Sequence, residues 1–234
     1  RSTLFPYTTL FRSFLSPWKD PETGKYKFWG RLNTGVVTLN LPHVALEMKE
    51  EKPDWNINNE DDKKKFFEKL DVYLEYCHRA LLEGHKYLES ATSDISPMLW
   101  QHGALARLEP GESIKSKIFD GYSTSSLGYV GLCETLTALT GKDHYETKEN
   151  KDFALQIAKY LSDKCKEWNK IPGQNHGFSL YGTPEESTTY KFAKALQKLH
   201  GIIPGVTDKN FIVNSYHCNI TRSEEHTSEL QSLA

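Results

Sequence analysis

The sequence predicts an α/β fold in which helices cover a largely parallel sheet. Three observations support this fold class. A β-branched stretch ends at a proline, two long segments place apolar residues at helical spacing, and short strand-like segments alternate with the helices along the chain. Alternation of single strands with helices is typical of strand–helix–strand units, whose strands run parallel.

The two ends of the chain differ from the remainder. Residues 1–13 and 222–234 show neither a helical nor a strand period, and both contain Arg-Ser where they join the remainder. Both are similar to translated sequencing adapters. We therefore expect them to be non-native ends, with residues 14–221 as the natural polypeptide. The alternative is that they are ordinary disordered tails.

The composition excludes several classes of function. The chain has 29 basic and 31 acidic residues and a formal net charge of −2, which argues against a nucleic-acid-binding surface. No apolar run has the length of a membrane span and no signal peptide is evident, so we expect a cytoplasmic protein without a membrane partner. Four scattered cysteines, without a C-x-x-C pair, predict neither a metal site nor disulfides but reduced, partly buried thiols. They are Cys77, Cys133, Cys165 and Cys218.

The first strand is predicted within Gly30–Pro42, after a short strand at Tyr26–Trp29. Alternate residues fall on two faces: Val37, Leu39 and Leu41 on one, and Val36, Thr38 and Asn40 on the other. Pro42 is expected to end the strand because it cannot donate a ladder hydrogen bond. A helix should start within His43–Met48, and the mostly acidic Lys49–Asp62 is expected to be an exposed loop.

The clearest predicted helix is Lys63–Ser90. Its apolar stripe consists of Phe67, Leu70, Leu74, Cys77 and Leu81. His78 and His85 are expected off this stripe, which argues against a metal-binding pair. A second amphipathic helix is predicted at Asp152–Trp168.

The segment Gly121–Gly141 combines four glycines with the hydroxyl run Ser123–Ser126. It predicts a strand end and turn followed by a helix at Val130–Thr140, which Gly141 closes. The segment matches neither a P-loop nor a dinucleotide-binding motif. A hydroxyl run of this kind fits a ligand site or a purely structural turn.

The segment after the predicted strand Phe178–Tyr181 fits a capping box, with Thr183 at the N-cap, Pro184 next and Glu186 three residues on. The helix should end at His200, before Gly201. Its hydroxyl-rich N-terminus could bind phosphate, although two carboxylates oppose an anion there and capping alone is the alternative. A last strand is predicted at Lys209–Ile220.

Six motifs together are far more specific than any one of them. They are SFLSPW (13–18), GRLNTGVVTLNLP (30–42), PMLWQHGALARL (97–108), GYSTSSLGYVGL (121–132), FSLYGTPEESTTYKFA (178–193) and GVTDKNFIVNSYH (205–217). This set closely resembles anaerobic ribonucleoside-triphosphate reductase, the class III, glycyl-radical type of ribonucleotide reductase. The resemblance covers essentially all of residues 14–221.

The resemblance implies that residues 14–221 are a fragment of a catalytic domain, part of a ten-stranded α/β barrel. In that family a glycyl radical near the C-terminus passes its spin to a cysteine. The thiyl radical then abstracts the 3′ hydrogen of a ribonucleoside triphosphate, and the 2′ hydroxyl leaves as water. The resemblance also implies formate as reductant, a radical-SAM activating enzyme, a homodimeric parent and a structural zinc site outside this fragment.

The resemblance also assigns site residues. Asn33 matches an active-site asparagine of the formate-using members, where its amide would hold the ribose hydroxyls or formate. The turn after Tyr181 matches the place that seats substrate phosphate. The expected substrate-binding residues are Gly182, Thr183, Glu186, Ser187 and Thr188, together with Ser125 and Ser126.

The sequence departs from the family pattern in one place that matters. The family has C-R-S-F-L where this chain has Phe11 before Arg12-Ser13-Phe14-Leu15. The radical cysteine, the glycyl-radical loop and the zinc-binding cysteines are not found in the chain, so we expect the parent to be an oxidoreductase and this piece alone to be inactive. Two alternatives stay open: another glycyl-radical enzyme such as a lyase, and a catalytically dead nucleotide-binding homologue.

Overall fold

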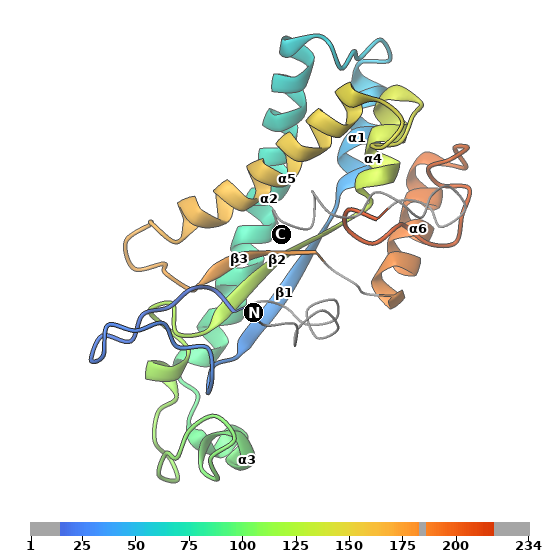
Figure 1. Ribbon diagram of the computed structural model, residues 1–234. Helices are drawn as coiled ribbons and strands as arrows, with labels where there is room; N and C mark the ends of the chain where they lie inside the picture. Colours follow the sequence, from blue (N-terminus) through green and yellow to red (C-terminus); the bar gives the residue numbers. More distant parts are fainter. Residues whose placement is uncertain (1–14, 183–185, 218–234) are drawn as a thin grey trace, which may run out of the picture. The chain divides into compact units, whose positions relative to one another are not determined.

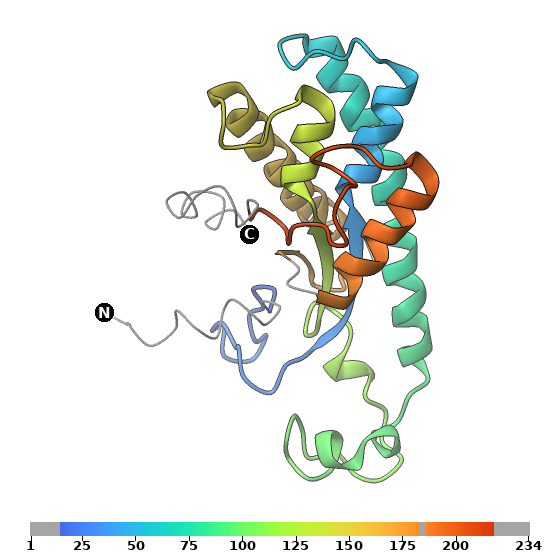
Figure 2. The ribbon, with the colours of Figure 1, turned by 90° about the vertical axis from the view of Figure 1, so that its right-hand side faces the viewer.

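The computed structural model describes residues 15–182 and 186–217 (Figures 1 and 2). These residues form two compact units. Unit 1 comprises residues 15–37, 77–127 and 163–181. Unit 2 comprises residues 38–76, 128–162, 182 and 186–217. Each unit is described by itself below.

The described residues form a three-stranded sheet with the order β1 (Asn33–Asn40), β2 (Thr124–Val130), β3 (Phe178–Gly182). Hydrogen bonds join the beginnings of the strands. The Thr124 amide donates to the carbonyl before β1 at 3.0 Å, and the Ser125 amide donates to the carbonyl before β3 at 3.3 Å. The strands therefore begin at the same edge and run parallel, and β2, buried at all seven residues, is the central strand. The α/β prediction is confirmed.

In unit 2 a proline and a glycine set the ends of the first two strands. β1 stops at Asn40 and α1 (Leu41–Glu51) follows at once, with Pro42 in its first turn, where a missing N–H costs nothing. Gly131 has a φ of 78° and ends β2. A Cβ atom on Gly131 would lie 2.4 Å from the Pro42 side chain, so only glycine fits there. The helix predicted from Val130 therefore begins two residues later, as α4 (Leu132–Thr140).

Helices α1 and α4 lie side by side in unit 2 (Figure 1). Helix α6 (Glu186–His200) packs beside α1 (Figure 2), where Ala193 and Leu196 share an apolar cluster with Leu46. The helix ends before Gly201, whose φ is 76°, as predicted. Thr183 and Pro184 lie outside the described residues, so the predicted capping box stays a prediction.

The long helix was predicted well, but its buried face is wider than the predicted stripe. Helix α2 (Glu60–Glu89) buries the expected leucines, and Phe66 rather than Phe67 is fully buried at its beginning. The prediction that His78 and His85 lie off the buried face is wrong, since both are buried. In unit 1 the His78 ring stacks on Trp168 at 4.5 Å, so α2 is covered on more than one side there.

The acidic segment between the first two helices is shorter and less exposed than predicted. Only residues 52–59 separate α1 from α2, and Trp55 and Asp62 are buried. The Lys52 ammonium donates to the Asp62 carboxylate, which also accepts the Asn56 amide at 2.9 Å. Asp62 is buried because these two donors satisfy its charge; the expected exposed loop was wrong for these residues.

The remaining helices are α5 (Lys148–Trp168), α3 (Pro97–Trp100) and the 3-10 turns η1 (Ser93–Ile95) and η2 (Lys115–Lys117). Helix α5 begins four residues before the predicted Asp152. In unit 1 a separate apolar cluster is centred on Trp100, Ile114 and Ile118. No helix within residues 15–182 and 186–217 is long and apolar enough to cross a membrane.

Two predicted strands are wrong. Tyr26–Trp29 makes only a single bridge, between Lys19 and Tyr26, and Trp29 is 71% exposed. The part of Lys209–Ile220 that the structure describes also forms one bridge, between Asn214 and Val130. Ser215 has a φ of 37°, which interrupts any strand. The backbone of this segment instead bonds to the start of α4, where the Gly131 amide donates to the Val213 carbonyl at 2.8 Å.

Candidate functional site

The hydroxyl run at the start of β2 lies entirely inside unit 1. Ser123, Thr124, Ser125 and Ser126 are each at most 1% exposed, and every hydroxyl has a hydrogen-bond partner. Ser123 donates to the Ile118 carbonyl and Thr124 bonds to Ser16, so the first two hydroxyls tie loops to the strand. These hydroxyls therefore mainly bond other residues inside unit 1. Ser125 and Ser126 are also residues of the predicted site.

Asn33, the first residue of β1, is half-buried and its amide is held at both ends. Nδ2 donates to the Ser126 hydroxyl at 2.5 Å, and Oδ1 accepts the Gly35 amide at 3.0 Å. These two bonds fix which end of the amide is the donor and which is the acceptor. The structure thus brings together two of the predicted site residues, Asn33 and Ser126.

Ser125 takes part in a second cluster with Thr34 and His85. The Ser125 hydroxyl lies 2.6 Å from His85 Nε2 and 3.0 Å from Thr34 Oγ1, and Thr34 Oγ1 lies 3.0 Å from the same imidazole nitrogen. Burial, together with the neighbouring His176, lowers the pKa of His85 to about 4. The imidazole is therefore neutral near pH 7.

Arg31 anchors the segment before β1. Its guanidinium is buried and donates to the carbonyls of Tyr122, Ser16, Lys27 and Gly121, and to the Ser16 hydroxyl. Burial lowers the pKa of Arg31. The fork of five N–H groups suits several carbonyls at once. Arg31 therefore holds residues 16–27 against the beginnings of β1 and β2.

Sequence reasoning assigned no role to Arg31, Thr34 or His85. One signal was present for the histidine: His85 follows Leu81 by four residues and so continues the apolar stripe of α2. The partners of Arg31 and Thr34 are distant in sequence, and no local pattern identifies them.

Of the predicted phosphate-binding residues, Gly182, Ser187 and Thr188 lie in unit 2, whereas Asn33, Ser125 and Ser126 lie in unit 1. Gly182 ends β3, and a Cβ atom there would lie 3.2 Å from the Ser215 hydroxyl. Ser187 is exposed and Thr188 half-buried in the first turn of α6. Thr183 and the Glu186 side chain lie outside what the structure describes.

The described cysteines are buried, and none of them forms a disulfide within the described residues. Burial raises the pKa of Cys77 to about 11 and that of Cys165 to about 12, and Cys133 is 4% exposed. None of the described cysteines lies in the C-R-S-F-L motif in which the resemblance places the radical cysteine. Cys218 lies outside the described residues.

Metal chemistry finds no support in the residues described. No group of three or more His, Cys, Asp or Glu side chains among them could hold a metal ion. The described residues therefore do not fit the zinc site that the resemblance implies.

Sequence comparison finds a family profile and several relatives that match nearly all of this chain. The profile of one family, described as anaerobic ribonucleoside-triphosphate reductase, matches residues 8–232. The enzyme of that name from Haemophilus influenzae is 36% identical over 213 residues, which cover 90% of this chain and 28% of the relative. That of Escherichia coli K12 is 33% identical with the same coverage, and that of phage T4 is 34% identical over 224 residues, 95% of this chain and 33% of the relative.

Structure comparison agrees on the fold. Crystal structures of the anaerobic ribonucleotide reductase from Thermotoga maritima match with TM-scores of 0.57, with citrate in the active site, and 0.55, with glycerol. Both are 16% identical and cover 80% and 76% of this chain, and 32% and 25% of the matched chains. The chain spans about a third or less of the length of the curated relatives it matches. Since the family profile matches nearly all of it, the chain belongs to the anaerobic ribonucleoside-triphosphate reductase family.

Proposed function

We propose that the protein to which this chain belongs reduces ribonucleoside triphosphates to 2′-deoxyribonucleotides by radical chemistry, with formate as reductant, for DNA synthesis. The names of relatives 33–36% identical to the chain support the reaction. The observation that carries the role of this chain is the fixed amide of Asn33 at the beginning of β1.

Asn33 is proposed to hold the ribose hydroxyls or formate. An amide offers a donor and an acceptor without carrying charge, so it can bond a hydroxyl or a carboxylate without taking up or losing a proton. Ser126 is proposed to orient the amide, because its buried hydroxyl accepts from Nδ2. Ser125 is proposed to act in the same indirect way, through its contacts with Thr34 and His85.

The beginning of α6 is proposed to seat the substrate phosphates, through Gly182, Thr183, Glu186, Ser187 and Thr188. A helix N-terminus presents unpaired backbone N–H groups and the positive end of the helix dipole, which together favour a phosphate. Helix α6 has 15 residues, and Ser187 in its first turn is exposed. Both properties support a site of this kind.

The further strands of the proposed barrel are expected in the remainder of the parent protein. The strands β1 and β3 are the two edges of the described sheet, and in a ten-stranded barrel each would pair with a further strand. The glycyl radical, when present, supplies the unpaired electron for hydrogen abstraction. We place the radical glycine, the radical cysteine and the structural zinc in other parts of a cytoplasmic, homodimeric parent that a radical-SAM enzyme activates.

The full-length protein tests this function. Purified without oxygen, activated, and supplied with formate and a ribonucleoside triphosphate, it should form deoxyribonucleotide that chromatography detects. Asn33→Ala should lower the turnover about a hundredfold or more, because it removes a polar group aimed at the reacting sugar. Asn58→Ala, at an exposed loop position, is the matched control and should leave turnover unchanged.

Three results would contradict the proposal. Wild-type turnover that is the same with and without formate would exclude formate as the reductant. An Asn33→Ala variant as active as Asn58→Ala would remove Asn33 from the site. A full-length wild-type protein that carries the radical but forms no product would favour a catalytically dead homologue.

A further inference from the structure

Helix α6 carries a stripe of lysines on the side opposite its buried face. Ala193 and Leu196 of this helix are fully buried in the apolar cluster of unit 2. Lys191, Lys194 and Lys198 follow one another at steps of three and four residues, and all three are exposed. Residues at this spacing are neighbours on one side of a helix. At about 3.6 residues per turn, the lysine stripe lies roughly opposite the buried residues.

The segment that follows α6 adds a fourth lysine to this surface. The Gln197 side chain donates to the Thr207 carbonyl at 2.7 Å and to the Lys209 carbonyl at 2.9 Å, which holds the segment against the helix. The Lys194 ammonium also donates to the Asn210 side chain at 2.7 Å. Lys209 therefore lies beside the stripe. Together the lysines form the α6 lysine surface, which consists of Lys191, Lys194, Lys198 and Lys209.

The positive charge of the α6 lysine surface is not balanced by its surroundings. In the part of the chain that the structure describes, no carboxylate lies within ion-pair distance of these four ammonium groups. Asp208 is next to the surface in sequence, but its carboxylate accepts the Gly205 amide at 2.9 Å. Exposed lysines elsewhere do have such partners, as Lys166 has in Asp163 at 2.8 Å. The α6 lysine surface can therefore attract an anionic partner.

Apolar side chains border the lysine stripe on both sides. Leu199 is 64% exposed, and Ile202, just after the helix, is 76% exposed. On the other side Tyr190 and Phe211 are 52% and 44% exposed. A lysine Nζ lies over each of these two rings, 5.7 and 5.9 Å from the centroids. Single exposed apolar residues are common, but several around one charged stripe are typical of an interaction surface.

These features favour a protein partner over a membrane or a nucleic acid. Helix α6 already buries its apolar face inside unit 2, so that face cannot insert among lipids. Single-stranded nucleic acids bind to long basic grooves with open aromatic rings, whereas this surface has four lysines and rings that lysines cover. An acidic protein segment fits both parts, since its carboxylates can pair with the lysines and its aliphatic side chains can pack on Leu199 and Ile202.

We propose that the α6 lysine surface docks an acidic helix of a partner protein. Carboxylates at steps of three and four residues on that helix would face Lys191, Lys194 and Lys198, because facing helices pair charges at matching spacing. Aliphatic side chains beside those carboxylates would contact Leu199. The surface consists of unit 2 residues alone and does not depend on the proposed reaction.

A synthetic helix tests the proposal on the full-length protein. The probe is a labelled peptide of about 20 residues of glutamate, leucine and alanine, with a glutamate at every third or fourth position. A second peptide has glutamine in place of each glutamate. Fluorescence anisotropy at low salt should give a Kd on the order of 0.1 mM for the glutamate peptide. The glutamine peptide should bind at least about tenfold more weakly, because it forms none of the ion pairs.

A triple variant removes the charge of the stripe. K191Q/K194Q/K198Q should weaken binding of the glutamate peptide about tenfold. K64Q/K86Q/K166Q is the matched control, because it changes the net charge equally at three exposed lysines that already have carboxylate partners. Binding to the control should stay within about twofold of the wild type, since exposed charges at a distance are screened by salt.

A single variant tests the apolar border. Leu199→Ser should weaken binding about threefold, because the peptide loses part of its apolar contact. Ile171→Ser, at an exposed position outside unit 2, should leave binding unchanged.

Several results would overturn the proposal. They are absence of binding of the glutamate peptide, equal binding of the two peptides, equal effects of the two triple variants, or unchanged binding to the Leu199 variant. Tighter binding of a single-stranded oligonucleotide or of phosphatidylserine vesicles than of the glutamate peptide would also overturn it, in favour of a nucleic acid or a membrane. None of these results depends on reductase activity.

Discussion

Each unit of the chain contains a pair of neighbouring histidines, and the two pairs have opposite surroundings. In unit 1 the rings of His85 and His176 lie 4.1 Å apart, and among the described residues no carboxylate is hydrogen-bonded to either. In unit 2 His43 Nδ1 lies 2.9 Å from His200 Nε2, and a carboxylate approaches each ring from the other side. The same side chain is thus an uncharged hydrogen-bonding group in one unit and part of a charged network in the other.

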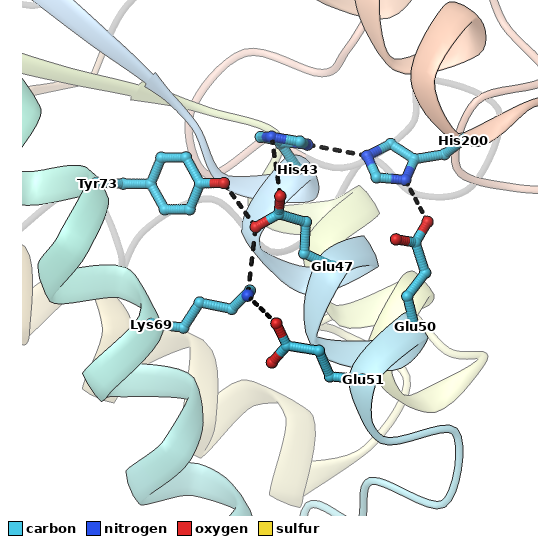
Figure 3. A network of polar contacts seen from close by, with 7 residues as sticks. All are labelled: His43, Glu47, Glu50, Glu51, Lys69, Tyr73 and His200. Atoms are coloured by element: carbon cyan, nitrogen blue, oxygen red, sulfur yellow. Dashed lines mark hydrogen bonds and ion pairs between the residues drawn. The ribbon is translucent and has the colours of Figure 1, made fainter.

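Figure 3 shows the charged network of unit 2. Glu47 lies 3.6 Å from His43 and accepts a hydrogen bond from Tyr73 at 2.5 Å, while Glu50 lies 2.6 Å from His200. Lys69 lies 3.3 Å from Glu47 and 2.6 Å from Glu51. Charges in this network are thus mostly compensated by opposite charges. In unit 1, backbone carbonyls and a hydroxyl accept the hydrogen bonds of the buried Arg31 guanidinium.

The largest expected effect tests how unit 1 holds a buried cation. Arg31→Met should lower the free energy of unfolding by on the order of 4 kcal/mol, because several buried carbonyls lose their donor at once. Urea unfolding followed by tryptophan fluorescence would measure the change. Arg107→Met, at an exposed position, should cost less than about 0.5 kcal/mol. A loss at Arg31 no larger than this would mean that its hydrogen bonds do not stabilise unit 1.

Glu134 is an exception to the charge compensation found in the network of unit 2. Its side chain is fully buried, Oε1 accepts the Val213 amide at 3.0 Å, and Oε2 has no partner among the described residues. Burial is the main cause that raises the pKa of Glu134 to about 7. A carboxyl group with a raised pKa stabilises the fold below its unfolded pKa of about 4.5, and this stabilisation is lost as the pH rises through about 7.

Glu134→Gln should therefore be more stable than the wild type at pH 8, by roughly 3 kcal/mol, and about equally stable at pH 4.5. The estimate is the free-energy equivalent of a pKa raised from 4.5 to about 7. Urea unfolding at a series of pH values would measure the difference. Glu149→Gln, an exposed replacement on α5, should show no such pH dependence. A pH-independent difference for the Glu134 variant would show that the carboxyl group does not titrate on unfolding.

The sequence alone predicted the elements whose signal is local. Apolar spacing located α2, and glycines correctly ended α4 and α6 at Gly141 and Gly201. The strand predicted at Lys209–Ile220 is wrong for residues 209–217, because a remote contact determines their structure. Its apolar residues, such as Ile212, pack in the unit 2 cluster, and its backbone bonds to the start of α4 rather than to a strand.

The same distinction between local signals and remote contacts applies to the candidate site. Asn33 was chosen because the motif around it resembles a family, and its role stays a prediction; its bond to Ser126 joins two residues chosen from the sequence. Arg31 and His85 could not be identified, since their roles arise from partners 91 and 40 positions away in the chain. Periodicity predicts that a side chain is buried, but it does not predict what that side chain bonds to.

The smallest expected effect tests the histidine pair of unit 2. A single hydrogen bond joins His43 to His200, so at least one of the facing nitrogens must stay unprotonated. Burial lowers the pKa of His43. A histidine with a lowered pKa stabilises the fold above its unfolded pKa of about 6.5, and this stabilisation is lost as the pH falls through the folded value. Acid should therefore weaken the link between α1 and α6.

His43→Gln should remove this pH dependence. Between pH 7.5 and 5.5 the wild type should lose about 1 kcal/mol more of its unfolding free energy than the variant, the usual worth of one such hydrogen bond. The other histidines titrate in both proteins, so the difference isolates the pair. His102→Gln, at an exposed position, should follow the wild-type curve. Parallel curves for His43→Gln and the wild type would show that the carboxylates around this pair prevent its titration from affecting stability.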